Sequence, residues 1–327
     1  MLARLRKPWT DRRAECTLGA VACLTALAIV LMVVFVAQRA WPTFSHEGLS
    51  WLGSGGSLDS QIGSMQSTSA TPPASVYFLR AWPLIYGTIL TAGFAVFFGL
   101  AFSLLTAIFI VDFAPPPVAR LMTPVIRLLA SVPSVVYGLI GVLVLVPFVG
   151  NHLISAGEKE SVVNVIQLTG AGLLVSVVIL TVMITPIMTA LITDALASVP
   201  RSWHEGAVAL GLNPLRATLA VSIRAIRPAI IAAAGLATAR AIGEAIMLSM
   251  VSGGKAFAPN FADGPIVLFE PLRTVAAEIV EQVDGRSAPA LRSSIYAFAL
   301  LLLFSGFMLS LASHLARLPL RKYELSS

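Results

Sequence analysis

The chain has 327 residues, of which 57% are apolar and only 12% are charged, and its formal net charge is +6. A soluble domain carries about 25% charged residues, so this composition, with a mean hydropathy of +0.87, excludes an ordinary soluble protein. The positive charge does not indicate nucleic-acid binding, because the basic residues lie at the ends of apolar segments and form no stripe on a soluble domain.

Six apolar segments are each long enough to cross a hydrocarbon core of about 30 Å as a helix. They occupy residues 18–37, 84–111, 124–149, 168–192, 229–251 and 293–316. The first is longer than the apolar core of a signal peptide and lacks a small-residue cleavage site, so we expect an uncleaved anchor. The sequence predicts an all-α integral membrane protein with six transmembrane helices.

The segments between the spans define the expected domain organisation. Residues 1–17 and 317–327 are polar ends, and residues 84–316 form a core domain of five spans that contains a polar loop at 194–228. The connector 38–83 has a middle rich in Gly, Ser and Thr, a composition that buries little apolar surface. We therefore expect this connector to be flexible, and its residues 54–74 to be dispensable.

A second connector, residues 253–292, contains a segment with helical spacing that cannot cross a membrane. Three acids, Glu278, Glu281 and Asp284, lie within it. We expect a surface helix here, and a better docking surface for an external partner than the Gly/Ser-rich connector.

The distribution of Lys and Arg predicts the orientation of the chain. With the N-terminus inside, the inside segments carry 14 of these residues and the longer outside segments carry 7. Because basic residues are enriched in cytoplasmic loops, both termini and the loop at 194–228 are expected in the cytoplasm.

Two charges interrupt the fifth apolar segment. Arg240 lies about halfway along it, and Glu244 follows one turn later on the same helix face. Charges at that depth cost several kcal/mol unless they face a protein interior or a wet cavity, which makes them candidates for a substrate pathway. The alternative is a structural Arg–Glu pair that satisfies itself within one helix.

The polar loop at 194–228 predicts a short helix. Pro200 suits a first helical turn, no breaker follows until Gly211, and Asn213 and Pro214 come next. The run Glu205-Gly206-Ala207, three residues, then Gly211 resembles the E-A-A-x-x-x-G signature of permease subunits of ABC importers, with Gly206 in place of the middle alanine. The resemblance implies a type I ABC importer permease fold, in which this loop is a coupling helix that docks on a separate ATPase subunit. An ordinary amphipathic helix at the membrane surface is the alternative.

A narrower resemblance covers most of the chain. The run A-S-V-P-S-V-V-Y-G-L at 130–139 and the run R-A-I-G-E at 240–244 are similar to the permeases of bacterial phosphate ABC importers, and the connector R-T-V-A-A-E-I-V-E-Q is more similar to the PstC branch than to PstA. The resemblance implies an importer of inorganic phosphate. It also implies a second, PstA-like permease subunit, a dimer of ATPase subunits and an extracytoplasmic phosphate-binding protein as partners.

An anion substrate agrees with the residues themselves. Arginine is always charged and offers a planar fork of donors to phosphate. Ser131, Ser134 and Tyr137 in the third span could add hydroxyl donors, although such residues also serve to join helices by hydrogen bonds.

No catalytic constellation is evident. His204-Glu205 begins an H-E-x-x-H zinc motif, but Val208 stands where the second histidine is required. We expect no metal site, no nucleotide site and no cofactor in this chain, so that ATP and Mg²⁺ would be bound by the partner ATPase. A permease for sulfate, molybdate or phosphonate, a stand-alone secondary transporter and an intramembrane enzyme remain alternatives.

Overall fold

The computed structural model describes residues 9–66, 78–161, 167–256 and 258–318. Within these ranges the chain is helical and contains no β-strand, which confirms the predicted all-α class. The long helices are α1 (Trp9–Glu47), α3 (Trp82–Ile108), α4 (Pro116–Ala130), α8 (Leu173–Ala197), α12 (Arg227–Ile242) and α15 (Pro289–Arg317). The short α-helices are α2 (Leu58–Gln66), α5 (Ser134–Ile140), α6 (Val146–Phe148), α7 (Ala156–Ser161), α9 (Arg201–Ala209), α10 (Pro214–Ala217), α11 (Ile223–Ala225), α13 (Ile246–Val251) and α14 (Val275–Glu281).

Short turns of other helix types connect or extend these elements. In the described residues the π-helical turns are η3 (Phe109–Phe113), η4 (Gly141–Leu145), η5 (Val149–Leu153) and η6 (Thr218–Ser222). The 3-10 helices of the same residues are η1 (Gly48–Leu52), η7 (Phe261–Leu268) and η8 (Val283–Ser287).

Five helical segments of the described chain are long and apolar enough to cross a membrane, and a sixth crossing results if one bent pair counts as a single span. The five are Ala14–Leu52, Trp82–Phe113, Ser134–Leu153, Leu173–Ala197 and Pro289–Arg317. The bent pair joins Pro214–Ala225 to Arg227–Ile242 at an angle of 71°. The chain is therefore a multi-pass membrane protein.

Two of the predicted spans are not continuous helices. The third, predicted at 124–149, is divided because α4 ends at Ala130 and α5 begins at Ser134. Pro133 causes this break, since it lacks an N–H and disfavours helical geometry in the residue before it. The fifth, predicted at 229–251, is divided because α12 ends before Gly243 and α13 begins only at Ile246; glycine is a poor helix former.

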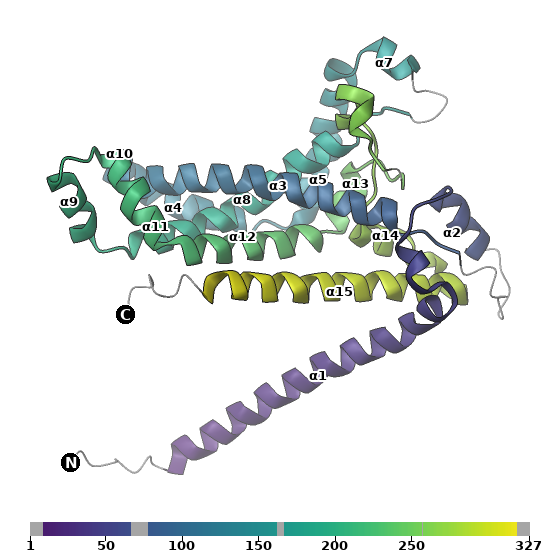
Figure 1. Ribbon diagram of the computed structural model, residues 1–327, viewed down its shortest axis with the longest axis horizontal. Helices are drawn as coiled ribbons and strands as arrows, with labels where there is room; N and C mark the ends of the chain where they lie inside the picture. The colour runs from purple at the N-terminus through teal and green to yellow at the C-terminus, as the bar shows by residue number, and fades with distance from the viewer. Residues whose placement is uncertain (1–8, 67–77, 162–166, 257, 319–327) are drawn as a thin grey trace.

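Helices α3, α8 and α12 run side by side and α15 flanks α12, which together form the main bundle (Figure 1). Helix α8 is the centre of the bundle. In its most apolar stretch of 18 residues, 67% of the residues are buried, compared with 0% in the corresponding stretch of the first span. Helix α1 meets α15 near its own C-terminal end, where Phe35 contacts Tyr296, and then diverges from the bundle toward its N-terminus (Figure 1). The apolar side chains of α1 are consequently exposed along most of its length.

A second hydrophobic core lies at the end of the bundle where α2 and α14 are found (Figure 1). Trp51, Leu58, Ile62 and Met65 are buried in it together with Phe298 of α15. The expectation that the whole connector 38–83 is flexible was therefore wrong: α1 continues through Glu47, and α2 packs with its apolar side on the bundle. The remainder of the Gly/Ser/Thr-rich segment, residues 67–77, lies outside the described residues.

Candidate functional site

The two charges predicted to face each other within one helix are separated by the break after α12. Glu244 is 9% exposed, and its Oε1 accepts a hydrogen bond of 3.2 Å from the backbone N–H of Met247, in the first turn of α13. The ion pairs of the described residues do not include Arg240. The alternative of a structural i,i+4 pair between Arg240 and Glu244 is not found among the described residues, because the helix ends at Ile242 and the Glu244 carboxylate accepts from an N–H group of the next helix.

Arg240 occupies the last turn of α12, and its side chain is exposed. A cation at a helix C-terminus is favoured by the helix dipole, which stabilises Arg240 there without a carboxylate partner. The arginine is close enough to Tyr137 of α5 to act on it electrostatically. Among the described residues, no carboxylate pairs with this guanidinium.

The three predicted hydroxyl groups surround the other helix break. The Ser131 hydroxyl donates to the carbonyl of Leu128 at 2.7 Å, and the Tyr137 hydroxyl donates across the break to the carbonyl of Leu129 at 3.0 Å. Ser134 begins α5 and is half-buried. Tyr137 is only 7% exposed, so its hydroxyl fixes the angle between α4 and α5. The Tyr137 bond agrees with the helix-joining interpretation, whereas the Ser131 bond is local to the end of α4 and joins no second helix. A substrate contact by either residue stays a prediction.

The two breaks are neighbours because α5 packs on α13. At Gly138 of α5, a Cβ atom would lie 2.8 Å from Sδ of Met250 and 3.3 Å from Cα of Met247, so only glycine permits this approach. The two non-helical turns, residues 131–133 and 243–245, therefore belong to helices in direct contact. The structure places all five residues predicted for the pathway at this pair of breaks: Ser131, Ser134, Tyr137, Arg240 and Glu244.

The predicted coupling helix is present as α9 (Arg201–Ala209). Pro200 precedes it, and Gly211 follows it with a φ of +92°, a left-handed conformation that favours glycine. Glu205 is exposed and Ala207 is buried. At Gly206, a Cβ atom would meet nothing within 4 Å, so the glycine in place of the family's alanine changes no packing within this chain. Helix α9 lies at the end of the bundle opposite α2 (Figure 1).

A cavity of about 600 Å³ lies between α9 and the bundle. Its walls include Asp112 of η3, Thr193 and Asp194 of α8, and His204 and Glu205 of α9. Within the described residues no group of His, Cys, Asp and Glu has the arrangement needed to hold a metal ion.

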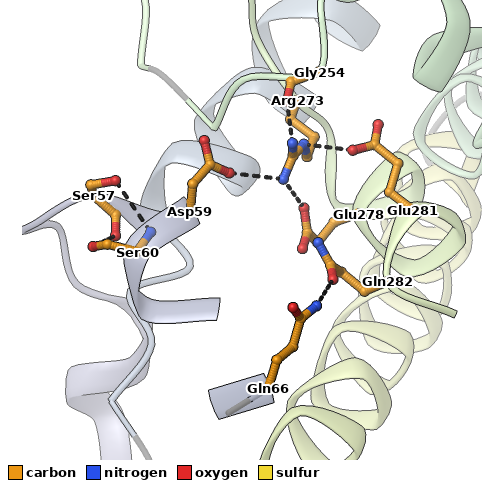
Figure 2. Close-up of polar contacts among 9 residues, drawn as sticks. All are labelled: Ser57, Asp59, Ser60, Gln66, Gly254, Arg273, Glu278, Glu281 and Gln282. Atoms are coloured by element: carbon orange, nitrogen blue, oxygen red, sulfur yellow. Dashed lines mark hydrogen bonds and ion pairs between the residues drawn. The ribbon is translucent and has the colours of Figure 1, made fainter. Parts of the chain in front are cut away.

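One charged cluster was missed by the sequence analysis (Figure 2), and it lies at the end of the bundle where α2 and α14 are found (Figure 1). Arg273 is 7% exposed and contacts three carboxylates. Its Nη1 is 2.8 Å from Oε2 of Glu278 and 3.2 Å from Oδ1 of Asp59, and its Nε is 3.0 Å from Oε2 of Glu281. Its Nη2 also donates to the carbonyl of Gly254.

The acidic segment predicted as a surface helix is therefore largely a buried one. In α14, Val275, Ala276, Ala277 and Glu278 are all buried, and Glu278 is 0% exposed. Burial raises the pKa of the Glu278 and Glu281 carboxyls, and the charge of Arg273 opposes this rise in pKa. The local signal for the cluster was the spacing from Arg273 to its two glutamates, whereas Asp59 lies 214 residues away and gives no local signal.

Comparisons with known proteins agree with this arrangement. A family model described as "Binding-protein-dependent transport system inner membrane component" matches residues 99–317. The "Probable ABC transporter permease protein YqgH" of Bacillus subtilis is 32% identical over 262 residues, which are 79% of this chain and 76% of that protein. The "Probable phosphate transport system permease protein PstC" of Methanocaldococcus jannaschii is 32% identical, over 74% of this chain and 76% of that protein. The "Phosphate transport system permease protein PstC" of Mesorhizobium japonicum is 28% identical, over 92% of this chain and 88% of that protein.

A solved structure supports the fold alone. The MetNI methionine ABC transporter, in inward-facing conformations, matches with a TM-score of 0.52 and 17% identity, over 75% of this chain and 97% of the matched chain. Together, the family match and this similarity confirm the predicted importer permease fold.

Proposed function

The chain belongs to the family of binding-protein-dependent transport system inner membrane components, and from this premise we propose that it carries inorganic phosphate across the cytoplasmic membrane as one permease subunit of an ATP-driven importer. Several of its relatives are named as phosphate transport system permeases. The substrate is proposed from those names and from the chemistry of the α12 break.

The observation that carries the proposal is the exposed guanidinium of Arg240 at the C-terminal end of α12. Its donors are not used by a carboxylate among the described residues, and a planar fork of N–H groups matches two oxygens of a phosphate. Glu244 is nearby in sequence but is occupied in capping α13. Its negative charge would discourage tight binding of an anion that must leave again.

The proposed coupling involves α9 and a partner. Glu205, Gly206, Ala207 and Gly211 would form the surface that contacts a separate ATPase subunit. ATP and Mg²⁺ would be bound by that partner, and this chain would have no nucleotide site of its own. The Lys and Arg distribution supports an orientation with α9 and both termini in the cytoplasm.

The remaining proposed partners follow from the family. A second, homologous permease subunit would complete the pathway, and a dimer of ATPase subunits would drive it. An extracytoplasmic phosphate-binding protein would deliver the anion to the end of the chain formed by α2 and α14.

A permease for another oxyanion, such as sulfate, molybdate or phosphonate, is the alternative, because one arginine does not distinguish between tetrahedral anions. The relatives named as phosphate permeases favour phosphate over these anions.

Uptake into reconstituted vesicles tests the proposal. The chain would be assembled with the homologous permease, the ATPase and the binding protein, and ATP-dependent uptake of radiolabelled phosphate would be measured with and without excess sulfate or molybdate. We expect uptake that depends on ATP and on the binding protein and that is not displaced by the competing anions. Displacement by sulfate or molybdate would contradict phosphate as the preferred substrate, and the absence of ATP-dependent phosphate uptake would contradict a phosphate importer.

A further inference from the structure

One hydrogen bond joins the loop that contains α9 to the central bundle. The hydroxyl of Thr218 donates to Oδ2 of Asp112 at 2.6 Å. Thr218 opens η6 and is 0% exposed, whereas Asp112 lies in η3, directly after α3. Within the described parts of the chain, no other hydrogen bond links residues 201–222 to α3 or η3.

Both partners of this bond lie in π-helical turns. Such turns inside α-helices are uncommon and are frequent at functional sites. Helix α9 packs on η6 and on α10, and the Asn213 side chain caps α10 by accepting from the N–H of Arg216 at 2.8 Å. A displacement of α9 would therefore move η6 as well. The hydrogen bond from Thr218 would pass this movement to Asp112, which belongs to the bundle.

Helix α3 leads from this contact to the opposite end of the molecule. Its 27 residues correspond to about 40 Å at about 1.5 Å per residue. Along its length it packs on α8, where the Ser103 hydroxyl donates to the carbonyl of Thr185 at 3.0 Å.

The far end of α3 is fixed to the segment that carries Arg273. The Thr88 hydroxyl accepts a hydrogen bond from the N–H of Val275 at 3.0 Å. At Gly87, a Cβ atom would lie 2.6 Å from the carbonyl oxygen of Arg273, so helix and loop are in direct backbone contact. One stiff helix thus touches η6 through Asp112 at one end and the Arg273 segment at the other.

We infer that Asp112 and Thr218 are positioning residues that transmit movement of α9 to α3 and, through α3, to the segment around Arg273. Coupling between distant sites requires contacts that connect rigid elements. In the described parts of the chain, the bond between Asp112 and Thr218 is the one hydrogen bond that connects residues 201–222 to α3 or η3. The inference rests on the proposed function, because it assumes that α9 is the element that an ATPase moves.

The test uses the complete reconstituted importer and measures radiolabelled phosphate taken up per ATP hydrolysed. Thr218→Val removes the donor with little change in shape, and Asp112→Ala removes the acceptor at an exposed position where the fold tolerates the change. A hydrogen bond to a charged group is strong enough to change an equilibrium by about tenfold. We therefore expect both variants to take up about tenfold less phosphate per ATP, with ATP hydrolysis within about twofold of the unchanged protein.

Two further variants separate transmission from simple stability. Thr218→Ser keeps the hydroxyl and should retain the normal ratio of uptake to hydrolysis. Thr193→Val is the matched control: Thr193 is a buried threonine that lines the cavity together with Asp112, and its hydroxyl is without a hydrogen-bond partner among the described residues. This control should also keep the normal ratio.

The outcomes distinguish this inference from the proposed function. If the unchanged complex takes up no phosphate, the proposed function fails and the inference fails with it. If the unchanged complex works and both Thr218→Val and Asp112→Ala keep its ratio of uptake to hydrolysis, only the inference is overturned. Equal losses of uptake and hydrolysis, with less assembled complex, would also overturn it, because that pattern indicates a purely structural bond.

Discussion

Arg240 and Arg273 are both arginines of a largely apolar chain, but their surroundings differ completely. Arg273 is buried and surrounded by Asp59, Glu278 and Glu281, all within 3.2 Å (Figure 2). Arg240 is exposed at the end of α12 and has no ion pair among the described residues. The charge of Arg273 is therefore balanced within the chain, whereas Arg240 has no carboxylate partner among the described residues.

The same difference determines what each arginine contributes to folding. A buried ion cluster costs desolvation energy that its internal contacts offset only while all partners are present. Arg240 belongs to no such cluster among the described residues, so its replacement breaks no buried ion pair. Substitution of Arg273 should therefore lower stability, whereas substitution of Arg240 should lower transport.

The largest effect is expected for Arg273→Met. Removal of the guanidinium leaves the fully buried Glu278 without its ion-pair partner, and breaking a buried pair costs about 3–5 kcal/mol. The measurement is thermal unfolding of the purified protein in detergent. Arg292→Met, a change at an exposed arginine of the neighbouring helix α15, serves as the control and should unfold nearly as the unchanged protein does. Equal unfolding temperatures for both variants would contradict the structural role of Arg273.

A slightly smaller effect is expected for Met65→Ala. Met65 is 0% exposed in the second core, and truncation of a buried methionine costs about 2–5 kcal/mol. The matched control is Met32→Ala, since Met32 is an exposed residue of α1. The measurement is again thermal unfolding of the purified protein in detergent. A negligible loss of stability for Met65→Ala would mean that the segment holding Asp59 beside Arg273 is loosely attached, which would weaken the comparison.

The sequence was informative where local pattern determines the structure. Apolar length located the spans, and Pro200 with Gly211 located α9, because proline and glycine act on the backbone next to them. The breaks after Ala130 and Ile242 also have local causes in Pro133 and Gly243, but membrane helices often tolerate these residues without a break, so continuous spans were expected.

Other features depend on contacts between distant segments. The burial of α2 requires α15 and α14, which are more than 200 residues away, and its own composition gives no sign of them. The burial of Glu278 likewise depends on Asp59 and Arg273, so the acidic pattern of α14 was mistaken for a solvent-exposed face. The roles of Arg240, Ser134 and Glu205 stay predictions.

The third effect concerns transport and should leave stability unchanged. Arg240→Lys keeps the charge but removes the planar fork, so phosphate uptake by the reconstituted importer should fall by about tenfold, equivalent to about 1.4 kcal/mol. Thermal unfolding should match that of the unchanged protein, because the side chain is exposed. Arg292→Lys is the control for uptake. Near-normal uptake by Arg240→Lys would contradict the prediction that the planar fork of Arg240 binds the anion. Arg240 and Arg273 would then differ only in their contribution to stability.

The smallest effect is expected for Glu281→Gln, and it concerns the pH dependence of stability. Burial raises the pKa of the Glu281 carboxyl above its ordinary value of 4.5, and the charge of Arg273 only partly opposes the rise in pKa. The folded chain then binds this proton more tightly than the unfolded chain. This tighter proton binding by Glu281 stabilises the folded chain fully below about pH 4.5. The stabilisation is lost as the pH rises through the raised pKa of the carboxyl.

Replacement of Glu281 by glutamine removes this titration. Because the Glu281 side chain is 25% exposed, the change in unfolding free energy should stay below about 1 kcal/mol. Thermal unfolding between pH 4 and pH 8, roughly the range over which these carboxyls titrate, should show a smaller loss of stability with rising pH for Glu281→Gln than for the unchanged protein. Glu160→Gln, at an exposed position of α7, should leave the slope as it is. A steeper slope for Glu281→Gln would mean that the ion pair with Arg273 outweighs the cost of burial. In that case Glu281 would stabilise the cluster through its charge, and Arg273 would need three charged partners instead of Glu278 and Asp59 alone.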